Sequence, residues 1–351
     1  MRKIIVLIAF ALIGFAACQN STEELVEQQQ SKIDMSDFFV YTEEEPALLS
    51  KSSNTKNCYS MKVLNKKLDE NPGLFKKMYD IEYATRKAIA AKKPDGVGGG
   101  PGNGGGGGSD PTPYTGTITI PVIVNILENN SGDVTQAQIN SQIAILNEDF
   151  NNNNPNTSNA PAEFAGLVAD VNITFTLAGV NRKISSKSTW GTNDSMKYSS
   201  QGGIDATDPS GHLNIWVCNI GGGILGYAQF PGGADATDGV VIGNDYFGET
   251  SGVYGDGRTA THEVGHWLNL RHIWGDGRCR QDDFVADTPN SDRSNGGCPT
   301  YPTVHCKSAD MTMNYMDYVY DDCMYMFTEG QNDRMRALFA TGGVRASFVG
   351  N

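Results

Sequence analysis

Residues 262–272 read HEVGHWLNLRH. This stretch contains three histidines, at positions 262, 266 and 272, and a glutamate directly after the first of them. On a helix, His262 and His266 lie one turn apart on the same face, with roughly 5 to 6 Å between their Cβ atoms, so both side chains can reach one metal ion. A histidine six residues after His266 cannot share that face, so the helix must end before His272. We expect the turn at Asn269, because asparagine enters the left-handed backbone region at modest cost.

These residue types have the chemistry of a catalytic zinc site. Three neutral imidazoles leave the fourth tetrahedral position of Zn²⁺ to water, whose pKa the ion lowers towards ~7. Glu263 is then predicted to be the general base that takes a proton from the attacking water and passes it to the leaving amine. The chain has only 5 histidines in 351 residues, which disfavours a coincidental cluster. A structural zinc site is an alternative, and a fourth protein ligand would close it.

A second informative stretch, Met313-Asn314-Tyr315-Met316-Asp317-Tyr318, lies downstream. Together the two stretches resemble the metzincin metallopeptidases, in which a turn containing methionine forms a floor beneath the zinc histidines. The resemblance implies that Met316 is this floor. It also implies that Tyr318 lies near the zinc and hydrogen-bonds the tetrahedral intermediate. The alternative for both residues is an ordinary packed side chain.

Within the metzincins, the flanking sequence resembles the pappalysin family and its ulilysin-like (cytophagalysin) bacterial branch. The likeness covers most of residues 113–351. One departure is Asn269, because the usual metzincin pattern has glycine at this position. Apart from the two stretches above, the likeness is carried by residues 213–217, 225–231, 238–241 and 327–336.

The resemblance implies an α/β fold of the metzincin type. Such a fold has a twisted sheet with backing and active-site helices above, an irregular, disulfide-stapled lower half, and a small helical propeptide in front. The sequence pattern itself predicts an amphipathic helix over 134–150, and a strand near 240–243 that borders the cleft. Further strands are predicted over 117–127, 171–177 and 213–220.

The first 17 residues predict a signal peptide, with Arg2-Lys3, an apolar run over 4–15 and Ala16-Ala17. Small residues directly before Cys18 resemble a bacterial lipoprotein cleavage site, after which Cys18 would carry the lipid. Phe15 departs from the preferred leucine, so soluble export stays open. Residues 18–50 are polar and acidic and predict a flexible tether. We therefore expect an exported protein, either a lipoprotein of the bacterial outer membrane or cell surface, or a secreted enzyme.

Residues 51–93 predict a helical segment interrupted near 71–73, and the glycine-rich residues 94–112 predict a linker before the catalytic domain at 113–351. The helical segment has 11 Lys and Arg against 4 Asp and Glu, whereas 113–351 has 13 against 26. These opposite charges should attract, as in a docked inhibitory propeptide, the chain's own intramolecular partner. A solvated helical spacer is the alternative. The net charge of −13 argues against a nucleic-acid partner.

Four cysteines near the active-site stretch are free to form disulfides in an exported protein. Three pairings are open from the sequence, and the resemblance to the ulilysin-like branch favours Cys279 with Cys306 and Cys298 with Cys323. Cys218 follows a strand-like run and is interpreted as a buried apolar side chain.

Cys58 opens the basic segment, and a thiolate there could occupy the fourth zinc position and exclude water. Ulilysin-like zymogens carry a comparable cysteine, usually next to arginine and glycine, whereas here the neighbours are Asn57 and Tyr59. A thiol without a metal role is the alternative to this zymogen switch.

The loop over 279–289 offers clustered oxygen ligands, and Ca²⁺ is their natural occupant. The resemblance implies calcium in this region, with Asp282, Asp287 and Thr288 as candidate ligands. A merely acidic turn is the alternative.

Asp322 follows Met316 by six residues, and the resemblance implies that it lines the pocket for the side chain just after the scissile bond. A carboxylate there would select Arg or Lys, whereas a solvent-facing aspartate is the alternative.

The sequence therefore predicts an exported, monomeric zinc endopeptidase that is made as a latent zymogen and acts on proteins or peptides, with one catalytic Zn²⁺ and a structural Ca²⁺. A zinc hydrolase of non-peptide amides and a catalytically inactive surface binding protein are the alternatives. A strand edge along the cleft suits a peptide substrate and argues against the first. Glu263 argues against the second.

Overall fold

The computed structural model describes residues 33–42, 58–92 and 112–350. The chain divides into two units, Met1–Asp37 and Phe38–Asn351. In the first, the described residues 33–37 contain a turn, and Asp34 accepts a hydrogen bond of 2.9 Å from the backbone N–H of Ser36. The predicted signal peptide, Cys18 and nearly all of the linker lie outside the described residues. Among the residues that are described, no helix is long and apolar enough to cross a membrane.

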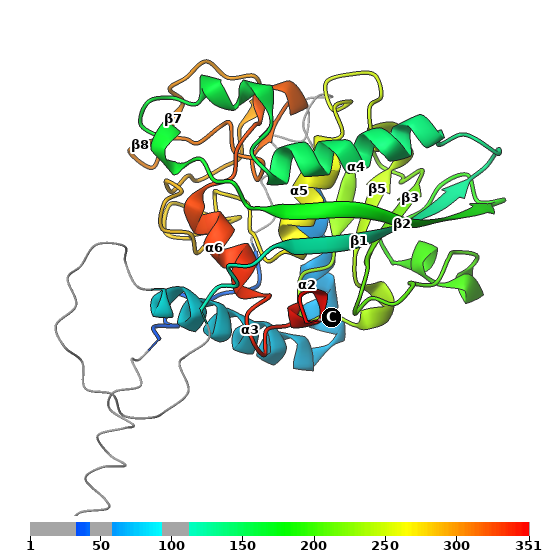
Figure 1. Cartoon of the computed structure of the whole chain (residues 1–351), viewed down its shortest axis with the longest axis horizontal. Helices are drawn as coiled ribbons and strands as arrows, with labels where there is room; N and C mark the ends of the chain where they lie inside the picture. Colours follow the sequence, from blue (N-terminus) through cyan, green and yellow to red (C-terminus); the bar gives the residue numbers. More distant parts are fainter. Residues whose placement is uncertain (1–32, 43–57, 93–111, 351) are drawn as a thin grey trace, which may run out of the picture. The chain divides into compact units, whose positions relative to one another are not determined.

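A five-stranded sheet forms the centre of the second unit, with strand order β2-β1-β3-β5-β4 (Figure 1). The first four strands in this order are parallel, whereas β4 runs antiparallel to β5 and occupies the edge. Most of β1 is buried, which agrees with its nearly continuous apolar sequence. The strands are β1 (Ile118–Glu128), β2 (Ile173–Ile184), β3 (Leu213–Cys218), β4 (Gly226–Ala228) and β5 (Val240–Gly243).

Helices α4 (Gln136–Phe150) and α5 (Arg258–Trp267) pack against this sheet and against each other (Figure 1). A capping box starts α4, since Thr135 Oγ1 accepts from the Gln138 N–H at 3.2 Å and Gln138 Oε1 accepts from the Thr135 N–H at 2.9 Å. The amphipathic helix predicted over 134–150 is therefore present, and it begins two residues later than expected.

The chain after α5 is mostly irregular. It contains α6 (Glu329–Ala337) and two short strand pairs, β6 (Gly296–Gly297) with β9 (Tyr318–Val319), and β7 (Val304–His305) with β8 (Ser308–Ala309). Disulfides join Cys279 to Cys306 and Cys298 to Cys323, which is the pairing that the resemblance favours. Short 3-10 helices cover Pro155–Asn159, Ala165–Leu167, Ser195–Lys197, Ser199–Gln201, Asp235–Thr237, Asn244–Tyr246, Asp321–Cys323 and Ala346–Phe348.

Two helices precede the sheet, α2 (Ser60–Glu70) and α3 (Pro72–Ala91), with the predicted interruption between them. Asn71 accepts a hydrogen bond of 3.2 Å from the Gly73 N–H, and Pro72 occupies the first helical position, where its missing N–H costs nothing. Helix α2 packs against α3 and β4, and α3 packs against α6.

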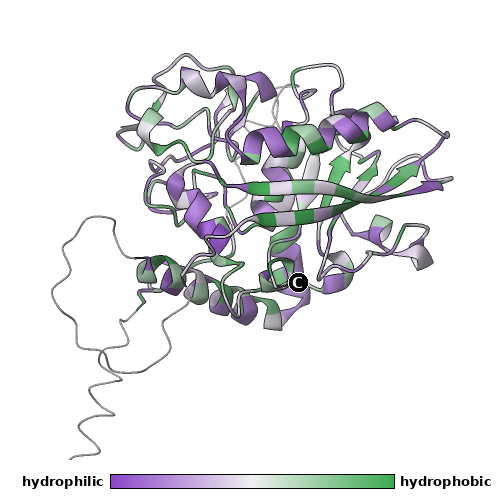
Figure 2. Cartoon of the chain, viewed as in Figure 1, coloured by the Kyte–Doolittle hydropathy of each residue, from purple (hydrophilic) through white to green (hydrophobic). Residues whose placement is uncertain are grey.

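The structure confirms the predicted α/β architecture with a helical segment in front, and it corrects one strand. The strand over 240–243 does not border the cleft, because β5 lies between β3 and β4. The edge is β4, whose three residues are too few to show a strand pattern in the sequence. Figure 2 shows hydrophobic residues along the strands, whereas α6 is largely hydrophilic although Arg334 and Arg336 on it are buried.

Candidate active site

Helix α5 carries the first two histidines and the glutamate, all three fully buried. The carboxylate of Asp321 accepts hydrogen bonds of 3.1 Å from the backbone N–H groups of Asp256 and Arg258, where the helix begins. A negative charge at this place favours the helix, because the first N–H groups of a helix lack partners within it.

The end of α5 delivers the third histidine. Asn269 has a φ of 71°, as expected for the turn. Its N–H donates to the His266 carbonyl at 2.9 Å, and the Leu270 N–H donates to the Gly265 carbonyl at 2.9 Å. This is the hydrogen-bond pattern of a Schellman motif, which ends a helix sharply and returns the chain.

Each histidine is oriented by an acceptor at its Nδ1 atom. His262 Nδ1 lies 2.7 Å from the Tyr315 carbonyl, and His266 Nδ1 lies 2.8 Å from the Leu270 carbonyl. His272 Nδ1 contacts a carboxylate oxygen of Asp276. Such contacts fix the tautomer that presents Nε2 to a metal ion.

The ligand atoms converge as a zinc site requires. The Nε2 atoms of His266 and His272 are 3.2 Å apart, and the Cys58 Sγ atom lies 3.5 Å from His266 Nε2. Ligand atoms of these residues and His262 all lie within 4.8 Å of one another. A tetrahedral ion with zinc–nitrogen and zinc–sulfur bonds of usual length implies separations of roughly 3.3 Å and 3.5 Å. The three imidazoles and the thiol therefore fit Zn²⁺.

Met316 lies against α5 between the two helical histidines. A Cβ atom on Gly265 would be 2.5 Å from the Met316 Sδ atom, so the helix needs glycine there. The Asn314 side chain fixes this turn by accepting a hydrogen bond of 2.9 Å from the Met316 N–H.

Tyr318 faces the same histidines. Its ring centroid is 4.8 Å from that of His272 and 5.8 Å from that of His262. Its hydroxyl donates to the Cys58 carbonyl at 3.4 Å. The Tyr318 hydroxyl can therefore donate a hydrogen bond to a backbone carbonyl of a peptide segment that lies in the cleft.

Residues 58–60 occupy the space between these groups and β4. The Tyr59 N–H donates to the Gly226 carbonyl at 3.1 Å, as Cys58 pairs in parallel with Gly226. Ser60 Oγ accepts from the Ala228 N–H at 2.7 Å and donates to Glu263 Oε2 at 2.6 Å. The sequence pattern did not single out Ser60, although it lies only two residues after Cys58.

The Cys58 thiol also contacts Glu263, with 3.5 Å between Sγ and Oε2. Without a metal ion, burial and the Glu263 charge raise the pKa of the Cys58 thiol well above its usual range. A thiolate at this place therefore needs a cation beside it. Cys218 is buried, and burial raises its pKa to about 12.

The three side chains predicted to bind calcium form hydrogen bonds with different residues of the domain. The Asp287 carboxylate accepts from Thr328 Oγ1 at 2.7 Å and from the Gly330 N–H at 2.8 Å, at the start of α6. Thr288 Oγ1 donates to Asp283 at 2.8 and 2.9 Å, while Asp282 accepts from the Phe284 N–H at 3.0 Å. Asp283, which the sequence pattern did not single out, is buried, and burial followed by its neighbour Asp282 raises its pKa.

Asp322 is exposed, and its Oδ1 atom lies 3.4 Å and 3.3 Å from the sulfur atoms of the Cys298–Cys323 disulfide. Its backbone carbonyl accepts from Asn156 at 3.4 Å. This carboxylate therefore lies at the surface beside the disulfide.

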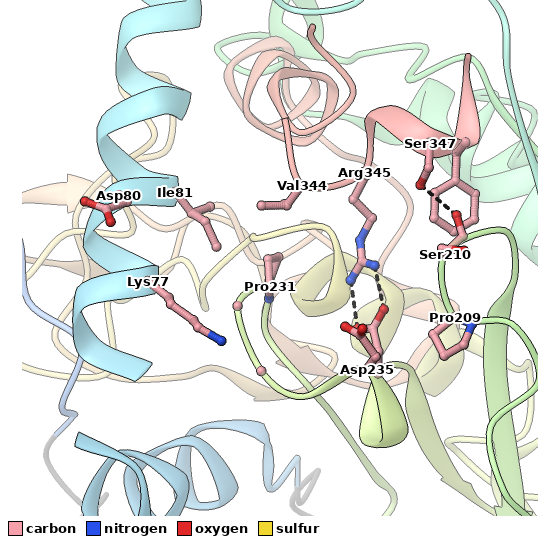
Figure 3. A pocket seen from close by; sticks show the side chains of 14 residues that line it. Lys77, Asp80, Ile81, Pro209, Ser210, Pro231, Asp235, Val344, Arg345 and Ser347 are labelled. Carbon is pink, nitrogen blue, oxygen red and sulfur yellow. Dashed lines mark hydrogen bonds and ion pairs between the residues drawn. The ribbon is translucent and has the colours of Figure 1, made fainter. Parts of the chain in front are cut away.

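A cavity of about 430 Å³ lies apart from the histidines, between α3 and the loop that follows β4 (Figure 3). Lys77 and Ile81 of α3 line one side, and Pro231 and Arg345 line the other. Arg345 is held by Asp238, with 2.6 Å between Nη1 and Oδ2. The cavity contains none of the histidines, and residues 58–60 fill the space beside them instead.

Comparisons with known proteins identify the family of this chain. The family model described as Peptidase_M43, pregnancy-associated plasma protein-A, matches residues 198–340. An extracellular metalloprotease of Arthroderma gypseum is 32% identical over 241 residues, which cover 64% of this chain and 73% of the relative. One of Colletotrichum graminicola is 31% identical over 239 residues, covering 64% and 76%.

Solved structures extend the likeness to the helical segment. Mature mirolysin of Tannerella forsythia in complex with a cleaved peptide has 47% identity and a TM-score of 0.65, covering 67% of this chain and 96% of that chain. A promirolysin mutant from Tannerella forsythia has 39% identity and a TM-score of 0.72, covering 84% and 97%. Taken together with the histidine site, these matches show that the chain is a metalloendopeptidase and belongs to the pappalysin family of metzincins.

Proposed function

We propose that this protein is a latent zinc endopeptidase in which His262, His266 and His272 hold the metal and Glu263 is the general base. The observation that carries the proposal is the convergence of the three imidazoles beside a buried carboxylate. Zn²⁺ bound there would polarise the substrate carbonyl and lower the pKa of a water molecule to about 7. Glu263 takes the proton of the attacking water and delivers it to the leaving amine. Tyr318 donates to the carbonyl oxygen under attack.

The set of three histidines and Cys58 also resembles a closed structural zinc site. Two observations favour catalysis. The fourth ligand comes from the segment before the glycine-rich linker, so after a cut in the linker it belongs to a separate fragment that can dissociate. Glu263 lies beside this ligand at 3.5 Å without being needed to complete the set.

The substrate is proposed to be an extended peptide laid along β4. Residues 58–60 already contact this strand, through the Tyr59 N–H to the Gly226 carbonyl and through the Ser60 hydroxyl to the Ala228 N–H. The structure of mature mirolysin with a cleaved peptide supports a peptide substrate for this chain as well.

Latency is proposed to rest on two contacts of the same segment. The Cys58 thiolate closes the metal position, and the Ser60 hydroxyl takes the place on Glu263 that the attacking water would use. The likeness to promirolysin supports a propeptide at 51–93 and a catalytic domain at 113–351. Maturation then needs a cut in the linker at 94–112.

Three finer features complete the proposal. Asp322 selects Arg or Lys just after the scissile bond. Ca²⁺ binds in the loop that contains Asp282, Asp287 and Thr288, where the buried Asp283 carboxylate gains from a cation. The protein is exported, either with a lipid on Cys18 or in soluble form, and the extracellular relatives support export.

The decisive experiment incubates the purified protein with a denatured protein, with and without a zinc chelator, and maps the cut sites by mass spectrometry. Chelator-sensitive cuts in internal peptide bonds are expected once the linker is cut and residues 58–92 have been separated from the catalytic domain. Unchanged substrate under both conditions would contradict the proposal.

A further inference from the structure

Helix α3 is fastened to the catalytic domain by a buried ion pair that involves none of the histidines. The Glu82 carboxylate meets the Arg334 guanidinium in two contacts, 3.0 Å between Oε1 and Nη1 and 2.5 Å between Oε2 and Nη2. Glu82 is 2% exposed and Arg334 is 1% exposed. Paired contacts of this kind combine charge attraction with fixed geometry.

Arg334 is also held by a contact within the catalytic domain. Arg334 Nε donates to the Asn269 carbonyl at 2.9 Å, a contact that does not involve Glu82. Arg271 is also buried, and its guanidinium stacks on the Phe284 ring at 4.6 Å. Arg334 faces the same ring at 5.5 Å.

Arg271 has donor capacity that its contacts leave unused. Its Nη2 atom donates to the Phe39 carbonyl, whereas its buried Nη1 atom has no hydrogen-bond partner within the described residues. Phe284 adopts a φ of 66°, which is rare for a bulky residue and marks strain in the loop that positions the ring. Two neighbouring guanidinium groups on one aromatic ring are a receptor for an anion of carboxylate type.

We propose that Arg271, Arg334 and Phe284 form a carboxylate-binding site of the catalytic domain, and that through Glu82 it retains residues 58–92 after the linker is cut. The Glu82 contact and the Cys58 contact are made by different side chains, so each can be removed by its own substitution. A cut in the linker alone then leaves the inhibitory segment in place. This inference rests on the proposed function only in treating residues 58–92 as the inhibitor.

The test uses the full-length protein with a cleavage sequence for an added protease placed in the linker. After cutting, size-exclusion chromatography under native conditions measures how much of the N-terminal fragment stays with the catalytic domain. In the parent, we expect co-elution and continued inhibition of peptidase activity. Glu82→Gln should release the fragment, with at least ten-fold weaker retention.

Asp80→Asn is the matched control, since Asp80 lies on the same helix, is exposed, and pairs with Lys76. It should retain the fragment as the parent does. Retention of the Glu82→Gln fragment at the parent level would overturn the inference, as would equal release of both variants. Because retention is measured by chromatography, the result can be read even if the proposed peptidase function is wrong.

A second experiment gives a result even if the full-length Glu82→Gln protein does not fold. The catalytic domain recovered from the cut parent is titrated with synthetic peptides of residues 58–92, with and without Glu82→Gln. The unchanged peptide should bind at least ten-fold more tightly. Equal affinity of the two peptides would also overturn the inference.

Discussion

The Ser60 hydroxyl donates a hydrogen bond of 2.6 Å to Oε2 of Glu263, while Cys58 Sγ lies 3.5 Å from Nε2 of His266. One short segment therefore contacts both groups that the proposed reaction needs, the metal ligands and the base. The two contacts can be separated by mutation, because each depends on its own side chain.

Ser60→Ala should raise the activity of the uncut protein, and Cys58→Ala should do so as well. A hydrogen bond to a charged group contributes about 1.5–3 kcal/mol, so loss of the Ser60 contact should weaken inhibition about ten- to a hundred-fold. The double variant should be more active than either single one in an assay with a peptide substrate. Lys66→Ala, at an exposed position of α2, is the control. If the uncut double variant stays as inactive as the parent, then the segment inhibits only by blocking access to the cleft.

Glu263→Ala should retain about one zinc ion per chain and lose nearly all peptidase activity, because the ligands remain while the base is removed. His266→Ala should lose the metal as well. Metal analysis and turnover of the catalytic domains, separated from residues 58–92 after linker cleavage, check both. Normal turnover by the Glu263 variant would refute the proposed mechanism.

Asp322→Ala should flatten a preference for Arg or Lys just after the scissile bond and leave the zinc content unchanged. Asp322→Lys should disfavour basic residues there, since like charges repel. Profiling of cut sites in a peptide library checks this. A parent enzyme that prefers apolar residues would contradict the assignment.

Retention of the cut N-terminal fragment should depend on pH through Glu82. Burial raises the pKa of Glu82, but the guanidinium groups of Arg334 and Arg86 outweigh it and lower the pKa from 4.5 to about 2. A lowered pKa stabilises the bound state above pH 4.5, and the part of that stabilisation that comes from Arg334 is lost as the pH falls from 4.5 towards 2. Between pH 7 and pH 5.5, the difference in retention between the parent and Glu82→Gln, measured by chromatography, should stay constant. The difference between the parent and Glu82→Gln should shrink below pH 4.5, and a constant difference would contradict this.

Removal of calcium under conditions that keep zinc bound should lower the melting temperature and promote self-cleavage near residues 276–290. The reason is that the buried Asp283 and its neighbour Asp282 would lose a neutralising ion. Thermal melting with and without added calcium measures the effect. Coincident melting curves would exclude a calcium role in this loop.

Local spacing made much of the site predictable. His262 and His266 are four residues apart on one helix, and the interruption at Asn71-Pro72 follows from the preference of proline for a helix start. The disulfide pairing could not be derived this way, since three pairings fit the sequence equally, and only the family resemblance favoured the pairing found.

Contacts between distant segments were not predictable. The charge pattern favoured attraction of a basic segment to an acidic domain, and Lys67 does meet Asp194 at 2.5 Å. The most buried ion pair between them has the opposite polarity, with the acid Glu82 on the helix and the base Arg334 on the domain, 252 residues apart. Net charge averages over such pairs and hides them.

The position of β4 at the end of the sheet has a consequence for handling the protein. An uncovered sheet edge offers unpaired N–H and C=O groups to any neighbouring molecule and invites strand pairing between chains. In the precursor, residues 58–60 cover this edge through Gly226 and Ala228. The segment that silences the enzyme therefore also shields it against self-association, and the precursor is the form in which the protein should tolerate high concentration.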